Sequence, residues 1–283
     1  MFHGNIGKAF ADQGQWEEAL RKGLEAAKTP PLQNVQIVFP YYGDELDRLI
    51  QQLKAPLMQQ VAARGGGVDE KELQFKAELY SELAAGYGIS DHEIESRFEG
   101  TVQERGPLNW KWVHAVLRAL DGTPLGDVAI DEFTRDVYVY LTYPAIWRAI
   151  NRMVTDRLTA GKWVVLAHSL GTVVGYNVLR DVKQQANIKV TRYVTVGSPL
   201  GVRAIRNRLE RPLIMPSCVA SWYNAFDPRD VVALNPLDGA NFPIEPAITN
   251  NGAVTNSTDN RHGITGYLDD RDVAREIAEA AQM

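Results

Sequence analysis

A short apolar run that leads directly into a serine turn and then a helix most constrains how this chain folds. Residues 162–167 (KWVVLA) form a short apolar run, which predicts a buried strand. The residues 168–171 (HSLG) follow at once, and residues 172–182 have helical spacing. Units of this strand–helix kind build parallel sheets that are covered by helices on both faces.

The same alternation continues along the chain. The patterns predict further strands at residues 34–42, 190–196 and 218–225, and helices at 14–28, 45–61, 132–159, 202–210 and 270–281. A long polar loop is expected at about 235–263. We therefore expect an α/β protein with a mostly parallel sheet flanked by helices.

Composition excludes several classes of protein. An apolar content of 45% excludes a disordered chain, and a single cysteine, Cys218, excludes a disulfide scaffold. One thiol also suits a reducing compartment, so we expect a cytoplasmic location. No apolar run reaches the roughly 20 residues that span a bilayer, and a net charge of −5 argues against a nucleic-acid partner.

Ser169 is the candidate nucleophile. A serine between a buried strand and a helix sits on a sharp turn, which needs small residues two positions before and after it; Ala167 and Gly171 meet that need. The backbone N–H of Leu170 and the helix dipole then point at a developing oxyanion. The alternative is that Ser169 only caps the helix.

A serine hydroxyl needs a general base to become a nucleophile, and the base needs a carboxylate to orient it. Of the five histidines, His262 lies in the polar loop before the last helix, where it can reach the carboxyl edge of the sheet, whereas His168 is expected to pack beside the turn. Asp227 and Asp230 both follow the strand predicted at 218–225. The order serine, aspartate, histidine matches one class of serine hydrolase. Asp230 is the preferred acid, with Asp227 as the alternative.

A second oxyanion donor is expected from the loop that begins at His3. Gly4 and Asn5 lie in a flexible stretch before the first predicted helix, where backbone N–H groups are available. The alternative is a chance dipeptide near the terminus.

Taken together, these segments resemble the α/β-hydrolase superfamily, and within it the lipase/esterase-like serine hydrolases. The matching segments are HGN at 3–5, PYYGDE at 40–45, AHSLG at 167–171, VTVGSPLG at 194–201, NAFDPRDVV at 224–232 and NRHGITGY at 260–267. They span most of the chain outside about 44–132. The resemblance implies that Ser169 is the nucleophile, His262 the base and Asp230 the acid. Leu170 and Asn5 would form the oxyanion hole, with Gly171, His168 and Gly4 supporting the elbow and loop.

The resemblance also implies hydrolysis of a small acyl ester through an acyl-enzyme, with no metal or other cofactor. A thioesterase or peptidase of the same fold, or a non-catalytic binding protein, is the alternative. The sequence departs from the family pattern in two ways. Alanine replaces the first glycine of the elbow, and only Met1 and Phe2 precede the HGN loop. We therefore expect the first strands of the sheet to be reduced, or the start to lie upstream.

Residues 44–132 are expected to form a helical cap inserted into a single domain of residues 1–283. The stretch 65–105 carries ten acidic and four basic residues, so the net negative charge belongs to the insertion. Its apolar stripe, which includes Leu73 and Tyr80, either packs on the core or lines an acyl pocket. The arginines at 203–211 form either a solvated face or a phosphate site. The oligomeric state stays open.

Overall fold

The computed structural model describes residues 2–3, 13–63, 70–98, 110–120, 127–182 and 187–283. Within these ranges the strands form one parallel sheet in the order β1-β2-β3-β4-β5. The strands are β1 (Phe2–His3), β2 (Gly161–His168), β3 (Ile188–Val196), β4 (Trp222–Ala225) and β5 (Thr249–Asn251). The parallel α/β architecture predicted from the sequence is confirmed.

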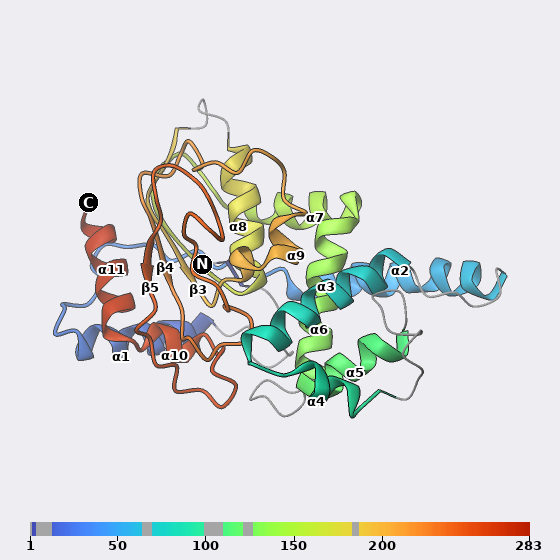
Figure 1. Ribbon diagram of the computed structural model, residues 1–283. Coiled ribbons are helices and arrows are strands. Elements are labelled where there is room, and N and C mark those ends of the chain that lie inside the picture. The colour runs from blue at the N-terminus through green and yellow to red at the C-terminus, as the bar shows by residue number, and fades with distance from the viewer. Residues whose placement is uncertain (1, 4–12, 64–69, 99–109, 121–126, 183–186) are drawn as a thin grey trace.

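Helices cover both faces of this sheet (Figure 1). In chain order, the helices before β2 are α1 (Gln13–Ala26), α2 (Gly43–Ala63), α3 (Glu70–Gly86), α4 (Asp91–Glu95), α5 (Trp110–Leu120), α6 (Asp127–Thr142) and α7 (Pro144–Thr155). After β2 come α8 (Leu170–Asp181), the 3-10 turn Pro199–Gly201, α9 (Arg203–Arg206), α10 (Thr265–Leu268) and α11 (Arg271–Gln282).

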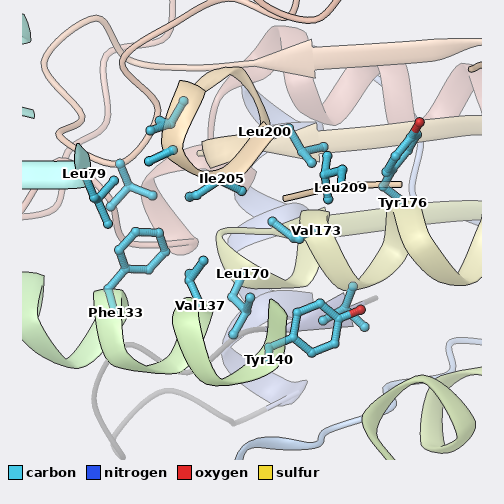
Figure 2. Packing of buried hydrophobic residues seen from close by; sticks show 14 of the residues in the cluster. Leu79, Phe133, Val137, Tyr140, Leu170, Val173, Tyr176, Leu200, Ile205 and Leu209 are labelled. Carbon is cyan, nitrogen blue, oxygen red and sulfur yellow. The ribbon is translucent and has the colours of Figure 1, made fainter. Parts of the chain in front are cut away.

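Alternating side chains of the strands pack into two hydrophobic layers. Val194 and Val196 of β3 point towards α1, α10 and α11, whereas Tyr193 points towards α8. On the α8 side, Leu170 and Val173 lie against Val137 and Tyr140 of α6 (Figure 2). Because β2, β3 and β4 are parallel, their carboxyl ends lie at one edge of the sheet, where loops can carry a site.

The strand predicted at 34–42 is wrong. Residues 34–40 are irregular, and Tyr41 forms only an isolated bridge before α2 begins at Gly43. An extended apolar run becomes a strand only where it pairs with another strand, and residues 34–40 join none of the strand pairs of the described sheet.

Other boundaries also differ from the sequence prediction. The helix expected at 132–159 is two helices, because Pro144 holds Tyr143 in an extended conformation and begins α7. The short strand β5 lies inside the loop expected at 235–263. The strand expected at 218–225 is regular only from Trp222, and the helix expected at 202–210 only over Arg203–Arg206.

Helix α3, in the segment expected to form the insertion, contacts the residues after β3 through ionic and polar groups. Glu82 of α3 accepts the backbone N–H groups of Arg203 and Ala204, and Glu78 pairs with Arg208 at 2.9 Å. Apolar residues of the insertion and of α8 form one continuous cluster. Because Arg208 is engaged by Glu78 and Arg206 by backbone carbonyls, protein groups occupy much of the basic stretch that had suggested a phosphate site.

Candidate active site

Ser169 alone makes the turn between β2 and α8. Its φ of 54° and ψ of −132° lie in a region that residues other than glycine rarely adopt. The turn is anchored, since the Ser169 N–H donates to the Val196 carbonyl at 3.3 Å and Thr172 Oγ1 donates to the Ser169 carbonyl at 2.8 Å. Strain of this kind costs about 1–3 kcal/mol and is concentrated at functional sites.

The hydroxyl of Ser169 is fully buried, and its Oγ has no hydrogen-bond partner among the described residues. Leu170 follows it as the first residue of α8, where backbone N–H groups lack an acceptor within the helix. The Leu170 N–H therefore lies at the N-terminus of α8, directly after Ser169. The other predicted donor, Asn5, and its neighbour Gly4 lie outside the described residues.

His262 and Asp230 form a buried pair. His262 Nδ1 lies 2.7 Å from Asp230 Oδ2, and Asp230 Oδ1 accepts the Val232 N–H at 2.8 Å. Because the carboxylate is an acceptor, it selects the tautomer in which Nδ1 carries the proton and Nε2 has a free lone pair. His262 Nε2 is buried and, within the described ranges, has no partner.

Asp227 does not contact His262. Its carboxylate accepts the backbone N–H and the side chain of Arg229 and the backbone N–H of Asn256. These bonds join the turn at residues 227–230, called the acid turn, to the loop at residues 256–262, called the histidine loop. Of the two predicted acids, the fold thus brings Asp230 to the histidine and uses Asp227 as a brace.

Tyr267 is a site residue that the sequence reasoning missed. Its hydroxyl donates to Asp230 Oδ2 at 2.5 Å and accepts the Asp227 N–H at 3.2 Å. Burial, together with the charge of Asp230, raises the pKa of Tyr267 well above its usual range, so the hydroxyl remains a donor. The only sequence signal was its place five residues after His262.

Gly197 allows the ring of His262 to lie close to the backbone that follows β3, next to the turn at Ser169. Its φ is +56°, and a Cβ at this position would lie 3.1 Å from His262 Cε1 and 3.2 Å from Asp230 Oδ2. Cε1 stands between the two ring nitrogens. Gly197 directly follows Val196, whose carbonyl accepts the Ser169 N–H. A chain of contacts therefore connects the serine turn to the imidazole edge.

His168 contacts the backbone of His262. Its Nε2 lies 2.7 Å from the His262 carbonyl, so that nitrogen carries a proton and donates. The two rings are also in contact, with centroids 4.6 Å apart and planes tilted by 36°. His168 therefore packs beside the turn, as the sequence predicts, and in addition restrains the backbone of His262.

The site is enclosed. Ser169 is 0% and His262 1% exposed. The helical insertion touches the acid turn here, since Tyr87 of the loop after α3 donates its hydroxyl to the Arg229 carbonyl at 2.7 Å. Removing water from such a site strengthens hydrogen bonds to developing charge.

Three further findings bear on the site. No family model, curated protein or solved structure matches the chain. Over the described residues, no group of three or more histidine, cysteine or acidic side chains is placed to hold a metal ion. In the same part of the chain, no helix has the length and apolarity needed to cross a membrane.

Proposed function

We propose that this protein is a serine hydrolase of the α/β-hydrolase fold that cleaves carboxylic-ester-type bonds. Ser169 is the nucleophile, His262 the general base and Asp230 the acid that orients it. The parallel sheet, the turn at Ser169 and the order of the three residues along the chain support this proposal.

The reaction follows from the roles proposed for these groups. Ser169 Oγ and His262 Nε2 make no hydrogen bond to each other in the described structure, so the first step requires the two atoms to approach. His262 Nε2 takes the proton of Ser169 Oγ as that oxygen attacks the ester carbonyl, and the oxyanion forms at the Leu170 N–H. The protonated His262 then returns its proton to the departing alcohol, which leaves an acyl-serine. Water, deprotonated by the same nitrogen, attacks the acyl group and releases the acid.

One observation carries the proposal. Ser169 Oγ and His262 Nε2 are both buried polar atoms without a partner in the described part of the chain. Such atoms are rare in folded proteins because each costs about 1–3 kcal/mol. Here they are the attacking atom and the basic atom of a predicted pair, and each is held in place through its neighbours.

Labelling with a fluorophosphonate probe tests the nucleophile. We expect Ser169 Oγ of the purified protein to attack the phosphorus of the probe, to displace its fluoride and to form a covalent bond to phosphorus. Ser169→Ala should abolish the adduct. Ser198→Ala is the matched control, because Ser198 is also buried and follows β3 but bonds Thr172. Absence of labelling, or equal labelling of Ser169→Ala, would overturn the proposal.

A hydrolysis panel tests the substrate class. Short and long acyl esters, the corresponding thioesters and peptide amides should be compared at equal concentration, with Ser169→Ala as the blank. We expect the highest kcat/KM for esters. A preference for thioesters or amides would be consistent with the triad but would change the type of bond that we propose is cleaved. Labelling without turnover of any substrate would favour a binding protein.

A further inference from the structure

Tyr87, the first residue after α3, contacts the peptide bond that leads into Asp230. Its hydroxyl donates to the Arg229 carbonyl at 2.7 Å, across 142 positions of the chain. That carbonyl and the Asp230 N–H belong to one peptide unit, and the N–H donates to the Asp227 carbonyl at 2.9 Å. Both polar groups of the unit are therefore bonded, one within the acid turn and the other by a residue from a distant segment.

These two bonds restrain the direction in which the side chain of Asp230 leaves the backbone. A peptide unit is planar, so holding its carbonyl and its N–H orients the whole unit and the Cα atom at its end. The bond to the Asp227 carbonyl lies inside the acid turn and moves with it. The bond from Tyr87 ties the same unit to α3, and therefore restrains the acid turn from outside.

The hydroxyl of Tyr87 remains a donor. Tyr87 is half-buried, and burial together with the negative charges of Asp230 and Asp227 raises the pKa of Tyr87 well above its usual range. The proton therefore stays on the oxygen throughout the pH range in which a histidine serves as a base. The effect of both charges also places the hydroxyl near the two aspartates.

Helix α3 is itself held against the residues that follow the acid turn. Glu82 accepts the side-chain amide of Asn235 at 3.2 Å. Gly86 approaches Leu234 so closely that a Cβ there would lie 2.6 Å from Leu234 Cδ2. The end of α3 and Tyr87 thus contact one stretch of chain, residues 229–235. Contacts on that same stretch therefore hold the tyrosine in place.

We propose that Tyr87 is a positioning residue for Asp230. The inference rests on the proposed hydrolysis, because Asp230 acts as the acid only there. Loss of the hydroxyl frees the Arg229 carbonyl, lets the peptide unit rotate and shifts Asp230 Oδ2 from its place 2.7 Å from His262 Nδ1. The imidazole is then held less well for proton transfer. Helix α3 takes part in catalysis through the acid and not through contact with the substrate.

A double-mutant cycle tests the proposal. Tyr87→Phe should lower kcat for ester hydrolysis about tenfold and leave KM within about twofold, because the residue acts on the acid and not on bound substrate. The loss is partial, since Val232 and Tyr267 also bond the carboxylate. In the Asp230→Asn background, Tyr87→Phe should cost less than about twofold, because no carboxylate is left to position. The rate at which the fluorophosphonate probe labels Ser169 gives the same comparison without the choice of an ester.

Tyr176→Phe is the matched control. The Tyr176 hydroxyl also donates to a backbone carbonyl, that of Ile214 at 3.2 Å, which lies outside the acid turn. This variant should melt at a lower temperature and keep kcat within about twofold. A similar loss from Tyr87→Phe in both backgrounds would show a structural role only, and an unchanged kcat would show none; either result overturns the proposal. Absence of hydrolysis by the unsubstituted protein would overturn the proposed function, and this inference with it.

Discussion

Tyr267 and Asp230 share a hydrogen bond of 2.5 Å on the same carboxylate oxygen that takes His262 Nδ1 at 2.7 Å. Two donors therefore compete for one oxygen. The tyrosine takes part of the negative charge of that oxygen, and it restrains the carboxylate beside His262 Nδ1.

Tyr267→Phe should lower kcat, because Asp230 Oδ2 loses the donor that holds it beside His262 Nδ1. We expect a loss of about tenfold, the scale of one hydrogen bond to a charged group, and therefore much less than for Asp230→Asn. Steady-state kinetics of ester hydrolysis measure the change. An unchanged kcat together with a lower melting temperature would show that Tyr267 serves only stability.

Substitutions of Asp230 and Asp227 should have different effects on activity. Asp230→Asn should lower kcat about 10⁴-fold, because an amide no longer selects the tautomer with a basic Nε2. Asp227→Asn should retain activity within about tenfold, since its carboxylate bonds Arg229 and Asn256 rather than His262. Steady-state kinetics of both variants check this prediction. The reverse ranking would make Asp227 the acid.

Asp227 should matter for stability in a pH-dependent way. Burial acts to raise its pKa, but hydrogen bonds from Arg229 and Asn256 lower it further, so the folded value is below the ordinary 3.8. Its stabilisation is therefore present above about pH 3.8 and is lost as the pH falls below that value. Asp227→Asn should cost about 1–3 kcal/mol at pH 7 and less at pH 3. Urea unfolding at both pH values measures the difference, and an equal cost at both would contradict this account.

Gly197 should be required for activity as well as stability. Alanine there would be strained by the positive φ, at about 1–2 kcal/mol, and its Cβ would crowd the ring of His262. Gly88→Ala is the matched control, because Gly88 has a φ of +68° with no atom near an added Cβ. Both variants should melt at lower temperature, but only Gly197→Ala should lose turnover. Equal activity of the two would show that Gly197 does not position the histidine.

His168 should act through the backbone of His262. His168→Leu removes the donor to the His262 carbonyl and should lower kcat about 10–100-fold, the scale expected from a small displacement of a catalytic group. His168→Gln keeps an N–H donor and should recover most of that loss. Ester hydrolysis by the two variants tests the order. If both lose activity equally, the contact between the rings rather than the hydrogen bond is the relevant one.

Local patterns in the sequence were sufficient for the parts of this protein that short stretches of chain decide. The apolar run 162–167, the turn at Ser169 and the helix behind it form a βα unit because strand, tight turn and helix are each determined by adjacent residues. The order of Ser169, Asp230 and His262 likewise indicated one group at the carboxyl edge of a parallel sheet, where His262 and Asp230 do meet.

Tertiary structure decided what depends on neighbours distant in sequence. The strand expected at 34–42 does not form, because pairing is set by the packed chain, and residues 34–40 join none of the strand pairs of the described sheet. The contact of His262 with Asp230, the hydroxyl of Tyr267 on the same oxygen and the close approach at Gly197 all join residues 30 or more positions apart or from different elements. A hydrophobic pattern records which face of an element is buried, whereas only the packed chain determines which buried polar atoms meet.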